Sequence, residues 1–71
     1  MNKEVFEFVI YMIHACSRKW GISPSVVYKK MQEHGCIDKF LIPHYEVLHT
    51  QGTQFVVEDI ELYLGIKGDV A

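Results

Sequence analysis

The sequence predicts an all-α fold, a small bundle of about four helices with the N-terminal helix at its centre. Three observations predict it. Apolar residues recur at helical spacing between residues 2 and 20, Ser23-Pro24 is a strong helix-start signal, and glycines follow the helical stretches. Because the chain has only 71 residues, we expect a single domain over residues 1–71.

The first predicted helix runs from about Lys3 to Lys19, with Asn2 as its N-cap and Gly21 after its end. When residues are placed at ~100° steps, apolar side chains fill an arc of roughly 200°, whereas a surface helix needs only about 100°. The arc consists of Val5, Phe6, Phe8, Val9, Ile10, Met12, Ile13, Cys16 and Trp20. We therefore expect this helix to be enclosed, either by the rest of the chain or by a second copy.

The second predicted helix spans Pro24 to His34. The Ser23 hydroxyl can accept hydrogen bonds from first-turn amides, and proline at the first helical position gives up only an amide that has no helical partner. Val27 and Met31 lie one turn apart on its inward face, and Gly35 is expected to end it.

The third predicted helix is short. Residues 36–42 are apolar without a clear period, and a proline inside a helix begun at Asp38 would break it, so we expect the helix to begin at Pro43 and continue to about Gln51. Its inward edge consists of Leu41, Tyr45 and Leu48. Gly52 is expected to end it.

The fourth predicted helix spans Val57 to Lys67, and the tail after Gly68 is expected to fray. Residues 53–57 form either a short extended segment or the start of this helix. Its inward residues are Val57, Ile60, Leu64 and Tyr63. Gly65 inside the helix costs about 1 kcal/mol relative to alanine. The acids of its first turn, which the helix dipole favours there, are Glu58, Asp59 and Glu61.

Composition excludes several classes of partner. The net charge of −2 and a sequence pI near 6.0 provide no basic surface for nucleic acid or an anionic membrane. The apolar run in the first helix is too short and too interrupted for a signal or a membrane span, so we expect a cytoplasmic protein. Two cysteines are too few for a disulfide framework.

The sequence contains no convincing catalytic or metal motif. His44 and His49 are five residues apart, whereas a zinc-protease helix needs histidines at a spacing of four. His14 and Cys16 point to opposite sides of a helix, which disfavours a joint zinc site with His34 and Cys36. Cys36 is the better candidate nucleophile of the two thiols, yet it has no evident base. We therefore expect no enzyme activity, no metal and no cofactor.

Polar and aromatic residues outside the apolar arc are the candidate partner contacts. Tyr11 and His14 lie on the polar stripe of the first helix, and tyrosine is enriched at interfaces. The full candidate set is Tyr11, His14, His44, His49 and Gln51. The alternative is that these residues are ordinary surface positions, and His49 can simply complement a helix C-terminus.

A helix-turn-helix arrangement of the second and third helices is an open alternative. A recognition helix presents Arg, Lys, Asn or Gln to base edges and phosphates. The third helix offers His44, Glu46, His49 and Gln51, with neither Lys nor Arg. Nucleic-acid binding is therefore the less favoured hypothesis.

Several segments together resemble a family of short bacterial proteins of unknown function. They are residues 8–16 (FVIYMIHAC), Trp20, Ser23-Pro24-Ser25, Val27-Tyr28, Gly35-Cys36-Ile37, and Tyr45 with residues 47–52 (VLHTQG). Members of this family are often encoded beside a second uncharacterised family that resembles ADP-ribosyltransferase toxins. The resemblance implies a small partner protein or an antitoxin-like role, and it carries no catalytic residues over.

The expected function is thus a non-enzymatic protein–protein interaction module, with the product of the adjacent gene as its partner. We also expect self-association, as a dimer through the first or the fourth helix. A DNA-binding regulator that uses the second and third helices is the alternative.

Overall fold

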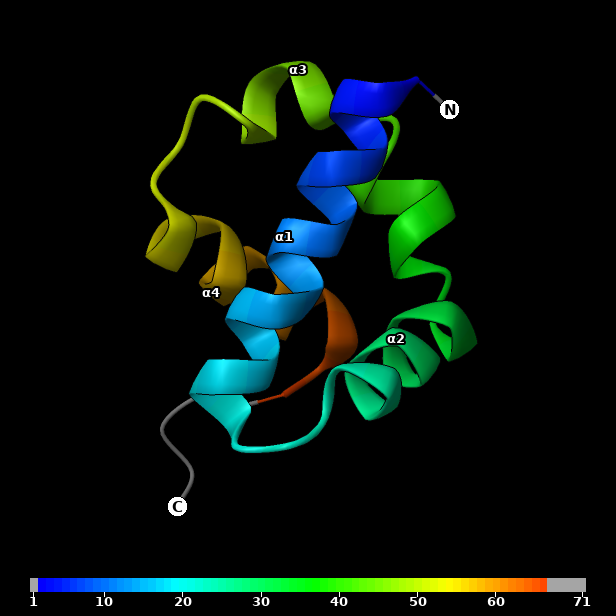
Figure 1. Ribbon diagram of the computed structural model, residues 1–71, viewed down its shortest axis with the longest axis vertical. Helices are drawn as coiled ribbons and strands as arrows, with labels where there is room; N and C mark the ends of the chain where they lie inside the picture. The colour runs from blue at the N-terminus through cyan, green and yellow to red at the C-terminus, as the bar shows by residue number, and fades with distance from the viewer. Residues whose placement is uncertain (1, 67–71) are drawn as a thin grey trace.

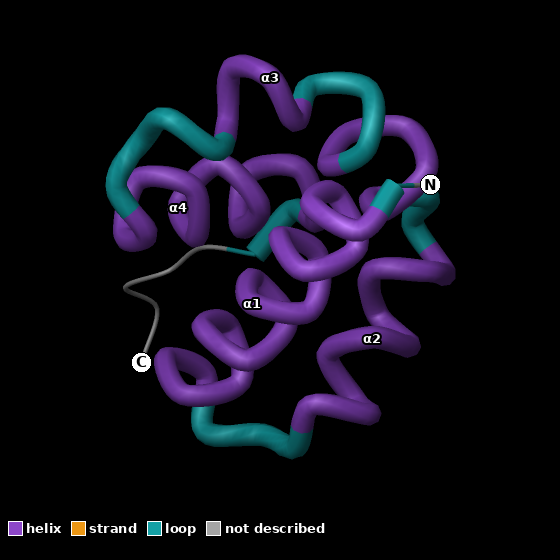
Figure 2. The backbone as a smooth tube through the Cα atoms, turned by 45° about the horizontal axis from the view of Figure 1, so that its top comes forward, coloured by secondary structure: helices purple, strands orange, loops and turns teal. Residues whose placement is uncertain are grey.

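The computed structural model describes residues 2–66, and the elements in that range are all helical. They are α1 (Lys3–Trp20), α2 (Pro24–Glu33), the π-helix η1 (Ile37–Leu41), α3 (Tyr45–Leu48) and α4 (Thr53–Leu64). α1 runs along the molecule between α2 and α4, and the single turn of α3 lies near its N-terminal end (Figure 1, Figure 2). The predicted all-α bundle with a central N-terminal helix is confirmed. Over residues 2–66, none of the helices has both the length and the apolar character needed to cross a bilayer.

α1 begins and ends where the sequence predicts, to within a residue. The Asn2 side chain accepts a hydrogen bond from the Val5 amide at 2.8 Å, which satisfies one of the free first-turn donors. At the other end Gly21 has φ +70°, a left-handed conformation that favours glycine, and its amide donates to the Ser17 carbonyl.

α2 also follows the prediction. The Ser23 hydroxyl accepts from the Val26 amide, Pro24 is the first helical residue, and the helix ends at Glu33, one residue earlier than expected. Val27 and Met31 are fully buried against α1. The pair anchors α2 to the core.

The segment after α2 differs from the prediction, because residues 37–41 are helical rather than irregular. The Ile42 amide donates to the Ile37 carbonyl at 3.0 Å, which is the wide turn of a π-helix. Ile42 keeps helical dihedrals (φ −69°, ψ −51°) although a proline follows, and the His44 amide reaches back to the Phe40 carbonyl at 3.2 Å. Pro43 therefore follows a helical turn instead of starting a helix.

α3 is accordingly a single turn, Tyr45–Leu48, where the sequence predicted a helix from Pro43 to Gln51. Its inward edge is as expected, because Leu41 and Leu48 are buried and Tyr45 is half-buried.

α4 begins earlier than predicted, so residues 53–57 are the start of this helix and not an extended segment. Val57, Ile60 and Leu64 are buried as expected, but Tyr63 is 38% exposed. Gly65 has φ +75° and ends the helix, so the expected cost of an interior glycine does not arise. The predicted end at Lys67 and the tail after Gly68 lie outside the described residues.

The apolar arc of α1 is enclosed only in part. The buried positions on α1 are Val5, Val9, Met12, Ile13, Ala15 and Cys16. Phe6 is 52% exposed and Ile10 is 40% exposed. The chain itself therefore encloses Ile13 but not Phe6 and Ile10, for which coverage by a second copy stays a prediction.

Candidate interaction surface

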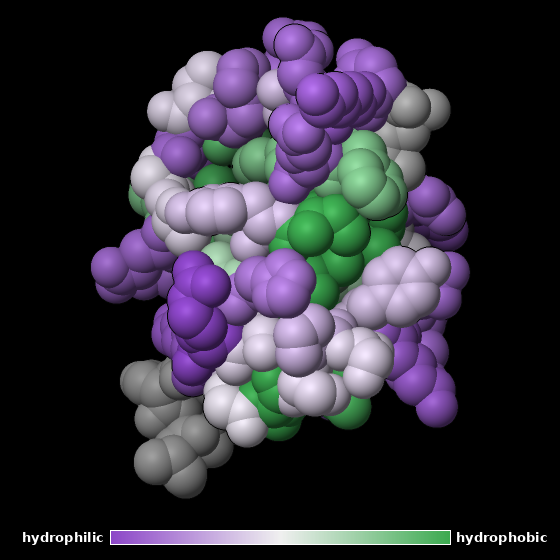
Figure 3. Space-filling model, in the orientation of Figure 1, coloured by the Kyte–Doolittle hydropathy of each residue, from purple (hydrophilic) through white to green (hydrophobic). Residues whose placement is uncertain are grey.

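An apolar groove lies between α1 and α2, and we define it as the α1–α2 groove. Its floor is one stripe of α1, formed by Phe6, Val9, Ile10 and Ile13, which recur at helical spacing. The opposite wall comes from α2 and the start of η1, and consists of Tyr28, Gln32, Gly35, Ile37 and Asp38. Figure 3 shows hydrophobic side chains gathered on this face of the molecule. The chain itself leaves the groove open.

The size of the α1–α2 groove decides what it can hold. Its volume is about 220 Å³, below the roughly 300 Å³ at which small-molecule sites begin. One large apolar side chain is a better match. Phe6, Ile10 and Tyr28 at its rim are 40–52% exposed, so an incoming side chain would find apolar surface around it. The sequence predicted that the apolar arc of α1 would be covered by the chain or by a second copy, but not which part of it the chain leaves open.

A second set of apolar side chains is exposed on the far helices. Its members are Val47 on α3 and Phe55, Leu62 and Tyr63 on α4. Leu62 is the most exposed of them at 78%. None of these four residues lines the α1–α2 groove.

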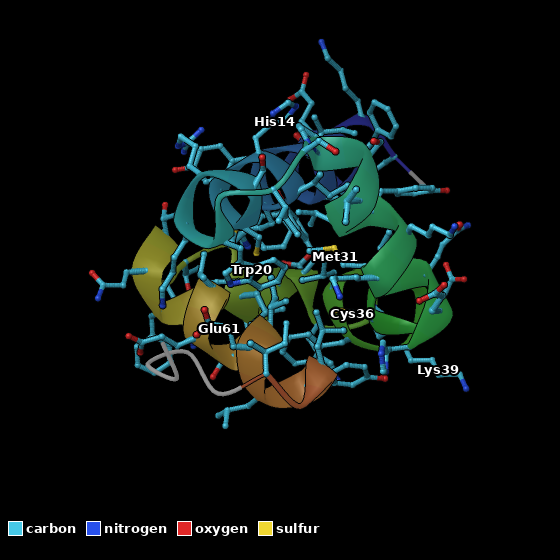
Figure 4. All side chains as sticks on the ribbon, turned by 90° about the horizontal axis from the view of Figure 1, so that it is seen from below. His14, Trp20, Met31, Cys36, Lys39 and Glu61 are labelled. Atoms are coloured by element: carbon cyan, nitrogen blue, oxygen red, sulfur yellow. The ribbon has the colours of Figure 1, made fainter. Side chains whose placement is uncertain are left out.

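The C-terminal end of α1 is fastened to α4 by a buried carboxylate. Glu61 is 4% exposed, and it accepts from Trp20 Nε1 at 2.7 Å and from Lys19 Nζ at 3.1 Å (Figure 4). The prediction that Glu61 is a first-turn acid is wrong, because α4 begins at Thr53 and Glu61 lies well inside it. Its spacing from Val57 and Leu64 places it on the inward face, a signal available in the sequence, but the partner across the bundle was not.

Both cysteines are buried thiols. Burial is the main reason that the pKa of Cys16 rises to about 12, and the neighbouring Cys36 and Glu61 raise it further. Burial also raises the pKa of Cys36 to about 11. Cys16 and Cys36 are both fully buried, whereas a reactive thiol needs a partly exposed setting. Residues 2–66 contain no group of three or more His, Cys, Asp or Glu able to hold a metal ion.

Tyr11 and His14, two of the candidate contact residues, occupy the exposed face of α1. The Tyr11 hydroxyl shares a 2.6 Å hydrogen bond with the Thr53 hydroxyl, which brings it to the start of α4. Thr53 is two residues from Gln51, so Tyr11 and Gln51 belong to the same region of the surface. His14 points outward from α1 into solvent (Figure 4).

His44 and His49 flank α3 on different aromatic partners. The His44 ring lies 5.8 Å from Phe40, whereas the His49 ring stacks on Tyr45 at 4.4 Å. His49 Nδ1 also contacts the Tyr45 carbonyl at 2.8 Å, consistent with the prediction that His49 complements a helix end. The structure therefore joins Tyr11 to the segment near Gln51 but does not gather all five candidates into one site.

The geometry of α3 also bears on nucleic-acid recognition. A recognition helix lays several side chains along the major groove. α3 has four residues and includes Glu46 in its only turn. α2 and α3 are further separated by η1, which replaces the short turn of a helix-turn-helix pair.

Comparison with known proteins identifies a family and no function. A family model described as a protein of unknown function (DUF3791) matches residues 7–66. That range includes α1 from Glu7 onward and every later helix. No curated protein and no solved structure matches the chain.

Proposed function

We propose, from the premise that this chain belongs to the DUF3791 family of proteins of unknown function, that it is a non-enzymatic protein–protein interaction module. The observation that carries the proposal is the uncovered α1–α2 groove, with Phe6 and Ile10 exposed at its rim. Apolar patches rimmed by polar residues are typical of interaction sites. Gln32 and Asp38 supply such a rim here.

The chemistry of the interior supports the same proposal. A cysteine nucleophile needs a partly exposed, electropositive setting. Cys16 and Cys36 are instead fully buried, and burial holds the pKa of each thiol far above neutral. The buried carboxylate of Glu61 is already bonded to Trp20 and Lys19, so it is committed to holding two helices together.

The proposal extends to the biological setting. We place the protein in the bacterial cytoplasm, as the antitoxin-like partner of the product of an adjacent gene. The resemblance described above motivates this part. We assign Tyr11, His14, His44, His49 and Gln51 as candidate contacts for that partner, because all five side chains reach the surface or its edge.

Co-expression with the product of the adjacent gene tests the proposal. A tagged chain is expected to retain that product through purification as a stable complex. The matched variants are Tyr11→Ala, on the exposed face of α1, and Lys30→Ala, on the exposed face of α2. Tyr11→Ala is expected to weaken capture, whereas Lys30→Ala leaves it unchanged.

The DNA-binding alternative predicts a different result from the same experiment. If the chain retained nucleic acid instead of the neighbouring protein, and shifted DNA in a gel at low salt, the module proposal would be wrong. Low salt is the sharpest condition, because phosphate contacts weaken steeply as counterions are added.

A further inference from the structure

The α1–α2 groove has a matching side chain at its own edge. Phe6 belongs to the floor of the groove, and because it is 52% exposed it also projects from the surface as an apolar group. When an exposed side chain and a groove lie next to each other on one surface, a two-fold axis between two copies places the side chain of each copy in the groove of the other. This is the isologous contact that most homodimers use.

The spacing along α1 fits such a pairing. Phe6, Ile10 and Ile13 recur at intervals of four and three residues, which is the spacing of a coiled-coil seam. In an antiparallel pair centred near Ile10, Phe6 of one copy lies opposite Ile13 of the other. The groove of about 220 Å³ extends over this part of α1 and can accept the ring.

Charge on the outer flank of the seam favours the antiparallel orientation. At ~100° per residue, Glu7 and His14 lie on the same side of the Phe6–Ile13 stripe, and both are exposed. Antiparallel pairing sets Glu7 of each copy beside His14 of the other, with Arg18 one turn further on. Parallel pairing would instead set the two Glu7 side chains on opposite sides of the seam, without a cationic neighbour from this flank of the other copy. Lys3 already contacts Glu7 within its own chain at 4.0 Å.

We propose that the α1–α2 groove is filled by Phe6 of a second copy of this chain, with two α1 helices antiparallel across a two-fold axis near Ile10. This inference rests on the proposed function and names one partner for it. A stable interface buries about 800 Å² on each side, so the contact includes Ile10 and Tyr28 and extends beyond the groove lining. The apolar residues on α4 stay free for a different protein.

Concentration-dependent association is the first test. Light scattering and sedimentation over a roughly hundredfold range of protein concentration are expected to show a monomer–dimer equilibrium, since dimer formation follows mass action. Phe6→Ala should weaken the dimer by roughly thirtyfold, the effect of losing a central anchor. Leu62→Ala is the control, because Leu62 is exposed on α4 away from the groove. Circular dichroism checks that both variants fold.

Cross-linking locates the axis. Ile10→Cys is expected to form a disulfide-linked dimer when diamide takes up the two thiol hydrogens, whereas Leu62→Cys is not. The native Cys16 and Cys36 are fully buried and do not compete. A strict monomer at every concentration, without a cross-link through position 10, would overturn the inference.

A charge-exchange cycle distinguishes the two orientations. Glu7→Arg and His14→Glu should each weaken the dimer, and the double variant should restore it. Within one chain the two residues are seven positions, or about 10 Å, apart, so intrachain coupling is small. Absence of coupling would reject the antiparallel arrangement.

The proposed function and this inference fail separately. If Phe6→Ala leaves the oligomeric state unchanged but abolishes capture of the neighbouring gene product, the groove belongs to that partner. The inference would then be wrong while the proposed function stands. If the chain forms the dimer but does not capture the neighbouring gene product, the inference stands and the proposed function is wrong.

Discussion

The two ends of α1 are closed in different ways. Near its C-terminus, Cys16 is fully buried and Glu61 of α4 receives hydrogen bonds from Trp20 and Lys19. Near its N-terminus, Phe6 and Ile10 line a groove that the chain does not cover. The apolar arc of α1 has a nearly uniform composition along its length. We call the C-terminal part of α1, where Glu61 receives the hydrogen bonds of Trp20 and Lys19, the sealed end, and the part that lines the groove with Phe6 and Ile10 the open end.

The difference teaches that apolar content alone does not decide which residues are buried. At the sealed end, the Glu61 carboxylate accepts from Trp20 and Lys19 and holds α4 against α1. At the open end, Tyr28 and Gln32 line the α2 side of the groove, and Phe6 and Ile10 stay exposed on its α1 side. An interaction site can therefore lie on the same helix as the core.

The strongest test of this comparison is a matched pair on α1. Met12 is 1% exposed and Ile10 is 40% exposed. Met12→Ala should lower the free energy of unfolding by about 3 kcal/mol, because it removes a buried side chain and leaves a cavity. Ile10→Ala should cost less than about 1 kcal/mol, since much of its surface is already in water. Urea denaturation measures both, and equal losses would contradict the difference in burial between the two positions.

The second test addresses the carboxylate at the sealed end. Glu61→Ala leaves the Trp20 indole without its acceptor and should cost about 2 kcal/mol. Glu61→Gln retains an oxygen for Trp20 and should lose about half as much. Glu58→Ala, on the exposed face of α4, is the control and should stay within about 0.5 kcal/mol of the parent protein. A Glu61→Ala protein as stable as the parent would show that the contact does not hold the helices together.

The third test is the decrease in the free energy of unfolding at alkaline pH. Burial raises the pKa of Cys16 to about 12 and of Cys36 to about 11, from an ordinary value of 9.0. The unfolded chain therefore releases these protons first, and the stability gained from neutral thiols is full below pH 9 and is lost as the pH rises toward 11–12. By pH 10 each thiol should account for about 1 kcal/mol of this loss. Cys36→Ala should show a shallower decline between pH 8 and pH 10 in urea denaturation, and an unchanged slope would argue against deep burial.

The smallest expected effect concerns the hydroxyl contact between α1 and α4. Tyr11→Phe removes the 2.6 Å hydrogen bond to Thr53 and should cost about 0.5 kcal/mol, because the bond is exposed and water replaces it. Thermal unfolding detects such a change. A loss as large as that of Glu61→Ala would mean that this exposed hydrogen bond holds α1 against α4 as strongly as the buried carboxylate does.

Local signals predicted α1 and α2 well, because Asn2, Gly21, Ser23 and Pro24 act within a few residues of themselves. The π-helix was missed, since Pro43 was taken to forbid a helical turn before it, and only the backbone path from Ile37 to Ile42 shows how a wide turn avoids the conflict. The start of α4 at Thr53 was left open because Gly52 caps it without a side-chain hydrogen bond.

The candidate site was harder to predict than the fold. Whether Phe6 is covered depends on where α2 and η1 run, and no local pattern fixes that. The pairing of Glu61 with Trp20 likewise joins residues 41 positions apart in the sequence. The five candidate contacts came from side-chain type and from the polar stripe of the first helix, which do not say how α1 lies relative to α3 and α4, and the structure brings only Tyr11 and the Gln51 segment together.

The walls of the α1–α2 groove are built from α1, α2 and η1, and no long loop contributes to them. Backbone hydrogen bonds therefore fix the shape of the groove before anything enters it. Ordering of flexible segments is one of the main entropic penalties of association. A side chain that enters the groove would lose conformational entropy, whereas the groove itself would lose little. A rigid groove selects its ligand by shape, so the α1–α2 groove should bind a leucine side chain and a phenylalanine side chain with different affinities.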